Sequence, residues 1–230
     1  ELHEQLECQL ARFERTVAAI LFPSGYAANT GTIPALVGPG DMILSDAKNH
    51  ASIIDGCRLS GASLAIYRHL DHQHAGELLD QQATAGRRLI VTDSLFSMDG
   101  DLAPLKQLAA LAEQYDAMLM VDEAHSIGTM GAHGRGLSEH FEIDPRDVDL
   151  WMGTLSKSFG SCGGYIAGCS SVVEYLKYTA PGFVYSVGIS PSNAANSCCR
   201  ASSPSMSVTA NFSGSARTGA ATGSARAAVA

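Results

Sequence analysis

The amino-acid sequence predicts an α/β protein, in which a mainly parallel, mixed sheet carries helices on both faces. The first observation is that short apolar runs alternate along the chain with segments whose apolar residues are spaced as on one face of a helix. This alternation is typical of strand–helix units in a parallel sheet. The second observation is the composition, because 46% hydrophobic and 17% charged residues over 230 positions are enough for one sizeable core.

The elements can be assigned in order from the amino terminus. Residues 2–13 predict a helix whose apolar face consists of Leu2, Leu6, Leu10 and Phe13. Residues 102–115 predict another, with the face Leu105, Leu108, Leu111 and Ala112. The apolar runs that predict strands are 18–22, 42–44, 64–67, 89–92, 118–121, 150–152 and 165–167. Residues 20–22 are also compatible with a continuation toward a helix that begins near Ser24.

Charge, hydropathy and cysteine spacing exclude several classes of protein. The net charge is −8, so no nucleic-acid surface is expected. No apolar run is long enough for a transmembrane segment. The spacing of the six cysteines matches neither a zinc site nor a secreted disulfide framework, which favours a cytoplasmic location. The histidines of residues 69–74 also lack zinc-motif spacing, and we expect a solvated loop there and no metal site.

Lys157 lies in a turn of small and hydroxyl-bearing residues, Thr-Leu-Ser-Lys-Ser-Phe-Gly, directly after the apolar run 150–152. A lysine is costly to hold among small residues at a strand end unless its amine has a task. A Schiff base with the aldehyde cofactor pyridoxal 5'-phosphate is such a task, and small neighbours leave room for the cofactor ring. From this segment alone, a solvated loop lysine is an equal alternative.

Asp122 and His125 follow the strand predicted over 118–121. A carboxylate at the carboxyl end of such a strand lies where open α/β sheets bind ligands. The pyridinium nitrogen of the cofactor needs an anionic partner, and Asp122 is suited to that role. His125 is suited to reach the phenolic oxygen of the ring. The alternative is an ordinary strand-end aspartate with a surface histidine.

Three further segments place polar groups beside predicted strand ends or helix starts. Gly25 and Tyr26 open a helix whose free backbone N–H groups suit a phosphate, and Tyr26 is suited to pack near the ring. His50 follows the second predicted strand and is suited to stack on the ring. Ser97 follows the fourth and is suited to donate to the ring oxygen. Their alternatives are a capped helix, a polar loop histidine and a simple turn.

Taken together and in this order, the segments resemble the α-oxoamine synthase family of fold-type I pyridoxal-phosphate enzymes. The resemblance spans roughly residues 3–196. The segments that carry it are SGYAAN, the D-x-x-N-HAS stretch, RLS, FSMDGDLAPL, VDEAHSIG, GAHGRG, and GTLSKSFG followed by a glycine pair. The FSMDGD and HAS segments favour this family over general aminotransferases.

The resemblance implies the large domain of a fold-type I transferase and a role for each matched residue. Lys157 is implied as the Schiff-base lysine, Asp122 as the pyridinium partner and His50 as the catalytic histidine that stacks on the ring. The remaining implied cofactor contacts are Ser97 and His125 at the ring oxygen, and Thr154 with the Gly25 and Tyr26 backbone at the phosphate.

The implied reaction is a decarboxylative Claisen condensation of an amino acid with an acyl thioester, on coenzyme A or a carrier protein, which gives an α-oxoamine. The resemblance also implies a homodimer. Four alternatives stay open. They are an oxoamine synthase domain of a polyketide-type assembly, as in saxitoxin biosynthesis, another fold-type I reaction, a non-catalytic partner subunit, and an inactive fragment.

The domain organisation departs from the family pattern at both ends. The amino-terminal segment and the carboxy-terminal small domain of the family, each with a substrate-facing arginine, are missing, so we expect an excerpt. Residues 1–196 are expected to form part of the large domain. Residues 197–230 contain 23 Ala, Ser, Gly or Thr among 34 positions, and we expect a disordered or frame-shifted tail.

Overall fold

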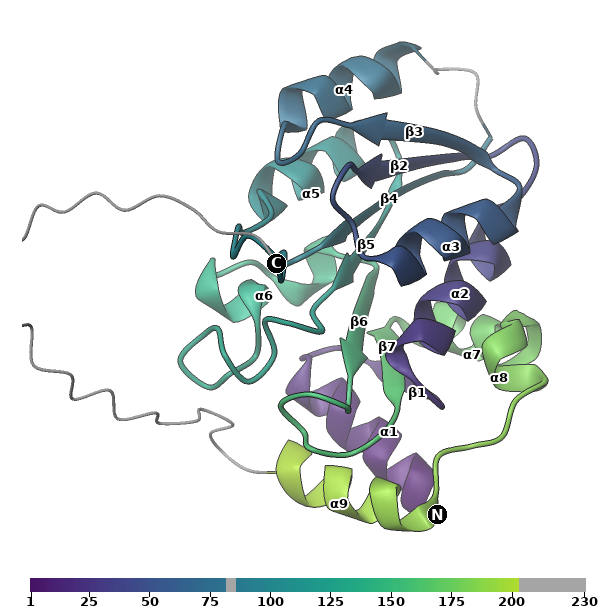
Figure 1. The fold of residues 1–230 in the computed structure, drawn as a ribbon, viewed down its shortest axis with the longest axis vertical. Coiled ribbons are helices and arrows are strands. Elements are labelled where there is room, and N and C mark those ends of the chain that lie inside the picture. The colour runs from purple at the N-terminus through teal and green to yellow at the C-terminus, as the bar shows by residue number, and fades with distance from the viewer. Residues whose placement is uncertain (82–85, 203–230) are drawn as a thin grey trace, which may run out of the picture.

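The computed structural model describes residues 1–81 and 86–202. These residues form a seven-stranded sheet in the order β1-β7-β6-β5-β4-β2-β3 (Figure 1). The strands are β1 (Ala18–Phe22), β2 (Met42–Asp46), β3 (Ser63–Tyr67), β4 (Arg88–Asp93), β5 (Met118–Asp122), β6 (Leu150–Thr154) and β7 (Gly164–Gly168). Every strand run predicted from the sequence is therefore a strand of this sheet.

The sheet is mostly parallel, as expected. Only β7, among the described strands, runs against its neighbours, with Leu21 of β1 and Gly153 of β6 both opposite Tyr165. The pairs β2–β3, β2–β4, β4–β5 and β5–β6 are parallel. The carboxyl ends of β4, β5 and β6 consequently meet at one edge of the sheet, where Asp93 lies opposite Asp122.

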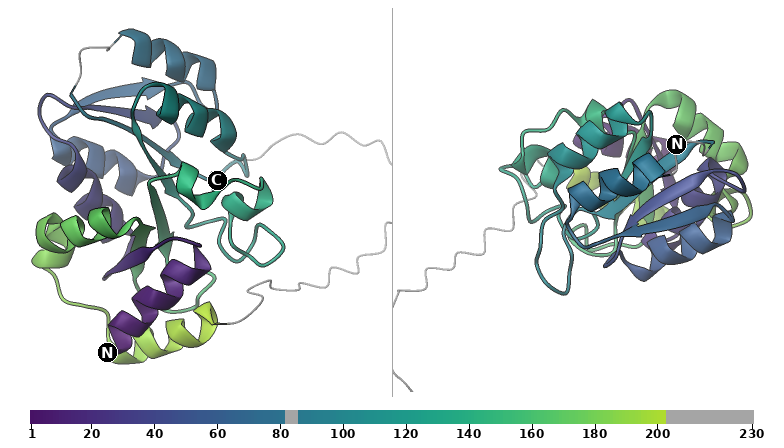
Figure 2. Two further views of the ribbon diagram at one scale, coloured as in Figure 1. Left: turned by 180° about the vertical axis from the view of Figure 1, so that it is seen from behind. Right: turned by 90° about the horizontal axis from the view of Figure 1, so that it is seen from above.

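Helices cover both faces of the sheet (Figures 1 and 2). One face carries α2 (Gly25–Leu36), α3 (Ala51–Ser60), α7 (Ser170–Thr179) and the short α8 (Pro181–Val184). The other face carries α1 (Leu2–Phe13), α4 (His72–Gln81), α5 (Leu105–Gln114), α6 (Leu137–His140) and α9 (Pro191–Ala201). A 3-10 turn, η1 (Pro145–Asp147), precedes β6. The three-layer arrangement confirms the expected fold class.

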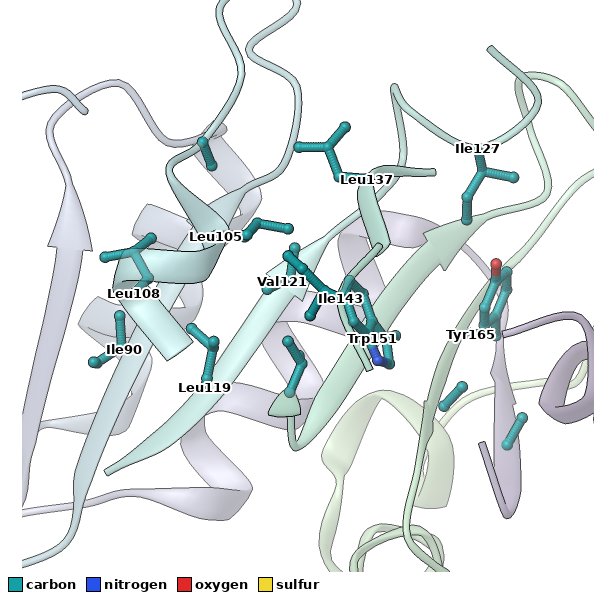
Figure 3. Close-up of a cluster of buried hydrophobic side chains, with 14 of the residues drawn as sticks. Ile90, Leu105, Leu108, Leu119, Val121, Ile127, Leu137, Ile143, Trp151 and Tyr165 are labelled. Atoms are coloured by element: carbon teal, nitrogen blue, oxygen red, sulfur yellow. The ribbon is translucent and has the colours of Figure 1, made fainter. Parts of the chain in front are cut away.

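The core forms because strand side chains alternate between the two faces. In β5, Leu119 and Val121 pack toward α5, whereas Met120 belongs to the cluster under α2 and α3. Figure 3 shows Leu105 and Leu108 of α5 over the first of these faces. Every one of these side chains is at most 1% exposed.

One boundary differs from the sequence-based expectation, and a second, which the sequence left open, agrees with the predicted strand. Helix α5 begins at Leu105, not at residue 102, because Leu102 forms an isolated bridge with Leu95 and Pro104 has no N–H to donate within a helix. At the other uncertain boundary, β1 runs to Phe22 and α2 begins at Gly25, so residues 20–22 are strand.

The carboxy-terminal helix α9 crosses the expected boundary at residue 196. It continues to Ala201, and Ser197 is fully buried, with Cys198 and Ala201 packed against the core. Residues 203–230 of the expected tail lie outside the described residues. None of the helices in the described part of the chain combines the length and apolarity that crossing a membrane requires.

Candidate active site

Polar side chains converge at the shared carboxyl edge of β4, β5 and β6. Asp93 and Asp122 are the last residues of β4 and β5, and Thr154 ends β6. Lys157 follows in the turn after β6. Because parallel strands end at the same edge, the sheet brings together residues that are far apart in the sequence.

Lys157 and His125 form the most direct contact between two of the predicted site residues. Lys157 Nζ lies 2.8 Å from His125 Nε2. Desolvation lowers the pKa of Lys157, while the charges of Asp122 and Asp93 act in the opposite direction. Partial burial, with the charge of Lys157, also lowers the pKa of His125. At this distance one of the two nitrogens donates a hydrogen bond to the lone pair of the other.

Asp122 is held as an acceptor at both oxygens. The carboxylate is 4% exposed. Oδ1 accepts a hydrogen bond from the Ala124 backbone N–H at 2.9 Å, and Oδ2 accepts one from Asn29 Nδ2 at 2.8 Å. The carboxylate is thus oriented by α2 and by the turn that follows its own strand.

A second buried carboxyl, Asp93, lies beside Asp122 and was not predicted from the sequence. It is 5% exposed, and Oδ2 accepts the backbone N–H of His50 at 2.6 Å. Burial, reinforced by the charge of Asp122, raises the pKa of Asp93 to about 8. Burial beside a second carboxyl therefore favours the protonated form of Asp93. Its position at the end of a buried strand, as for Asp122, was the available sequence signal.

His50 caps the amino terminus of α3 and is exposed at the edge of this group. Its Nδ1 accepts the Ser52 backbone N–H at 3.2 Å and lies 2.7 Å from Ser52 Oγ. Ser52 Oγ in turn accepts a hydrogen bond from Asn29 Nδ2 at 2.9 Å. Asn29 and Ser52 are further residues that the sequence analysis missed, although both lie within the segments SGYAAN and HAS.

Gly25 and Thr154 meet at the amino terminus of α2. A Cβ atom at Gly25 would lie 2.9 Å from Met152 Cε and 3.3 Å from Thr154 Oγ1. Glycine therefore allows a close approach that sets the first-turn N–H groups of α2 beside a hydroxyl. Tyr26 follows in the same turn, 52% exposed, and its hydroxyl donates to Asp55 Oδ2 on α3 at 2.8 Å.

Among the residues that the structure describes, Ser97 is not connected by hydrogen bonds to the other predicted site residues. It lies in an exposed turn after β4, and no hydrogen bond links it to the other predicted residues within 1–81 and 86–202. The structure thus gathers Lys157, His125, Asp122 and His50 by direct contact or shared partners, and leaves Ser97 at the surface.

His69 belongs to the segment expected to be a solvated loop, but its side chain is only 16% exposed and connects Asp46 at the end of β2 with Asp101. Its Nδ1 lies 2.8 Å from Asp46 Oδ1 and its Nε2 lies 3.1 Å from Asp101 Oδ2. The ligand atoms of His69, Asp99 and Asp101 lie within 4.8 Å of one another. Both ring nitrogens already have protein partners, and Asp99 pairs with Lys48 at 2.7 Å.

Comparison with known proteins assigns the family. Residues 1–210 match the model described as aminotransferase class I and II. The chain belongs to the aminotransferase class I and II family. Its sheet and helices form the large-domain fold of the fold-type I transferases in this family.

Relatives of this aminotransferase class I and II chain include two 8-amino-7-oxononanoate synthases. The protein from Geobacter sulfurreducens is 54% identical over 191 residues, which cover 83% of this chain and 49% of the relative. The protein from Thermosipho melanesiensis is 50% identical over 194 residues, covering 84% and 49%. The chain therefore spans about half the length of the curated relatives it matches.

Solved structures show the same architecture. Serine palmitoyltransferase from Sphingomonas wittichii superposes with a TM-score of 0.82 at 38% identity, covering 87% of this chain and 50% of that one. The 8-amino-7-oxononanoate synthase from Francisella tularensis gives 0.77 at 31% identity, covering 87% and 57%. A serine palmitoyltransferase solved with pyridoxal phosphate as its internal aldimine has a TM-score of 0.83 at 34% identity, covering 87% and 50%.

Proposed function

We propose that this chain is the cofactor-binding half of a pyridoxal-phosphate enzyme, with Lys157 as the residue that holds the cofactor. The observation that carries the proposal is the convergence of an amine, a buried carboxylate and a glycine-lined helix start at one sheet edge. The donor set fits this group: Lys157 for the aldehyde, Asp122 for the ring nitrogen, and the Gly25–Tyr26 backbone with Thr154 for the phosphate. His50 is proposed to stack on the cofactor ring, and His125 and Ser97 to contact the ring oxygen.

Each residue has a definable task. The cofactor, when bound, supplies an electron-withdrawing ring that stabilises negative charge on the amino-acid Cα. Asp122 keeps the ring nitrogen protonated through its negative charge. Lys157 acts as the general base at Cα, and its lowered pKa favours the free amine that this task needs. His125, at 2.8 Å, provides a lone pair for the proton of that amine.

We propose that the whole protein condenses an amino acid with an acyl thioester and releases carbon dioxide, the thiol and an α-oxoamine. The relatives support this class of reaction by name, since one names an amino-oxo product and the other an acyl transfer to serine. Because the chain spans half of these proteins, the amino acid and the acyl donor are left open. We also propose a homodimer in the cytoplasm, the latter supported by six free cysteines.

The first experiment identifies the lysine. The full protein is loaded with pyridoxal phosphate, reduced with borohydride, digested and mapped by mass spectrometry. The cofactor mass is expected on Lys157. Attachment instead to Lys48, Lys106 or Lys177 would contradict the assignment.

The second experiment identifies the reaction. The loaded protein is supplied with single amino acids and a series of acyl-coenzyme A thioesters, and thiol release, carbon dioxide release and product mass are followed together. All three are expected for the same substrate pair. Conversion of the amino acid to an oxo acid without thiol release would assign transamination instead.

A further inference from the structure

A chain of directed hydrogen bonds links Asp122 to His50 through two residues on different helices. Asn29 of α2 donates through Nδ2 to Asp122 Oδ2 at 2.8 Å and to Ser52 Oγ at 2.9 Å. Ser52 of α3 lies 2.7 Å from His50 Nδ1. Asn29 and Ser52 are 0% and 1% exposed, so water does not compete with these bonds.

The orientation of the Asn29 amide follows from its neighbours. Asp122 Oδ1 accepts the Ala124 backbone N–H, and in the proposed function Asp122 is the ionised partner of the cofactor ring nitrogen. A carboxylate only accepts hydrogen bonds. The Asn29 atom that faces it must therefore be the NH2 group, and both of its hydrogens are used. Asn29 Oδ1 is left buried without a partner among the described residues.

This orientation fixes the direction of every bond up to His50. Ser52 Oγ accepts from Asn29, so the hydroxyl proton of Ser52 is free to point at His50 Nδ1. The backbone N–H of Ser52 also points at Nδ1, at 3.2 Å, and a backbone N–H can only donate. Nδ1 therefore presents its lone pair, and in the neutral imidazole the proton lies on Nε2.

The backbone of His50 is held from the other side. Its N–H donates to Asp93 Oδ2 at 2.6 Å, and the Asp93 backbone N–H donates to Asn49 Oδ1 at 2.9 Å. The backbone of His50 is thus held by Asp93, whereas its ring is held by Ser52, which Asn29 links to Asp122.

We infer that Asn29 and Ser52 are positioning residues that hold His50 as the neutral Nε2–H tautomer while orienting Asp122. In the proposed reaction, on which the role of this tautomer rests, His50 then presents a hydrogen-bond donor at Nε2. That donor suits the carbonyl oxygen of an acyl thioester, which gains negative charge when it is attacked. His50 does not serve as a base at that nitrogen, and the proton on Cα is left to Lys157.

The tautomer can be measured without turnover. The protein is labelled with 15N-histidine, and the Nδ1 and Nε2 shifts of His50 are read at a pH where its ring is neutral, with His50→Gln used to identify the signals. We expect an unprotonated Nδ1 and a protonated Nε2. A protonated Nδ1, or rapid averaging of the two tautomers, would overturn the inference.

Two variants separate positioning from stability. Ser52→Ala leaves only the longer backbone contact to Nδ1, so the two tautomers should mix, and kcat of the full protein should fall by up to about a hundredfold. Ser60→Ala removes a buried hydroxyl at the other end of α3, bonded to Cys57 O at 2.7 Å, and should change neither the tautomer nor kcat.

The two readouts distinguish this inference from the proposed function. If Ser52→Ala retained the pure Nε2–H signal, the relay would be refuted whatever the reaction is. If the full protein released no thiol with any substrate pair while wild type and Ser52→Ala showed the expected shifts, the relay would stand and only the proposed reaction would fall.

Discussion

Asp93 and Asp122 face each other across the β4–β5 pair at the ends of two parallel strands, and only Asp122 accepts a hydrogen bond from a side-chain amide. Asp122 is bonded to the Asn29 amide, whereas Asp93 receives a backbone N–H from His50. Two adjacent buried carboxyls cannot both ionise cheaply. Burial, and then the charge of Asp122, raise the pKa of Asp93 to about 8.

The first prediction concerns stability and pH. Because the folded-state pKa of Asp93 is about 8 and its ordinary value is 3.8, the folded state holds a proton that the unfolded state releases between these pH values. The contribution of Asp93 to stability is therefore fully present below pH about 4 and is lost as pH rises toward 8. Asp93→Asn removes this loss, so between pH 5 and pH 8 the stability of the variant should rise relative to that of wild type by roughly 3–4 kcal/mol, at about 1.4 kcal/mol per pH unit.

Urea unfolding at both pH values measures this difference. Glu14 and Glu123 also have raised pKa values, about 8 and about 7, but they are present in both proteins and cancel in the comparison. Asp99→Asn serves as the control, because Asp99 is exposed and its pKa is lowered by Lys48. Parallel pH profiles for wild type and Asp93→Asn would contradict a protonated Asp93.

The second prediction concerns the relative reactivity of two lysines. Desolvation lowers the pKa of Lys157, and the hydrogen bond to Asp99 raises that of Lys48. In the cofactor-free protein, Lys157 should therefore reach half of its limiting rate of acylation at a lower pH than Lys48. Brief treatment with acetic anhydride across a pH series, followed by peptide mapping, gives both curves in one sample.

Asp99→Asn provides the internal check on this comparison. It should move the Lys48 curve to lower pH and leave the Lys157 curve in place, since Asp99 contributes to the pKa of Lys48 alone. The reverse order of the two lysines in wild type would remove the electrostatic support for Lys157 as the free amine of the site.

The third prediction concerns the glycine at the start of α2. Gly25→Ala places a methyl group 2.9 Å from Met152 Cε and 3.3 Å from Thr154 Oγ1, so the Met152 side chain, Thr154 or the helix start must shift. Overpacking of this size costs about 1–3 kcal/mol, and the proposed phosphate contacts bear part of it. We expect pyridoxal phosphate to bind at least about tenfold more weakly.

Fluorescence titration with the cofactor measures this affinity in the full protein. Gly38→Ala is the matched control, because its added methyl would meet only Ser60 O at 3.9 Å. Unchanged affinity in Gly25→Ala, with Gly38→Ala also unchanged, would mean that the phosphate binds elsewhere.

The fold was predictable because its signals are local. Apolar runs such as 118–121 are both short enough and apolar enough to be buried strands, and all seven appear in the sheet. The start of α5 was less predictable, because residues 102–103 continue the periodic pattern but bond to the segment after β4 instead. The spacing of apolar residues does not reveal that a segment pairs with a distant part of the chain instead of extending a helix.

The site was predictable only in part, for a similar reason. Lys157, Asp122 and His50 have recognisable positions after strand ends. Asn29 and Ser52 are ordinary polar residues within helices, and their importance comes from facing each other across α2 and α3. Predicting Asp93 as a site residue required the order of the strands in the sheet. Its carboxyl can interact with that of Asp122 only because β4 and β5 are neighbours.

The last prediction concerns a buried cluster behind the site, where Tyr165 of β7 meets Glu14. Tyr165 is fully buried, and its hydroxyl donates to Glu14 Oε1 at 2.5 Å. Burial raises the pKa of Glu14 to about 8, and the nearby charge of Glu123 adds to this, while the Tyr165 hydroxyl acts to lower it. Tyr165→Phe removes that donor from a carboxyl with 2% exposure, which should lower the free energy of unfolding by about 1–3 kcal/mol.

Tyr67→Phe is the matched variant for this measurement. Tyr67 is equally buried, but its hydroxyl lies near Thr92 without a hydrogen bond of ordinary geometry among the described residues. Loss of a hydroxyl that has no good partner should cost little, because no bond is broken and a desolvated polar group is removed. Urea unfolding at pH 6, where Glu14 is protonated in the folded state, compares the two variants under one condition. Equal losses for Tyr165→Phe and Tyr67→Phe would show that the Glu14 contact contributes nothing to the stability of the fold.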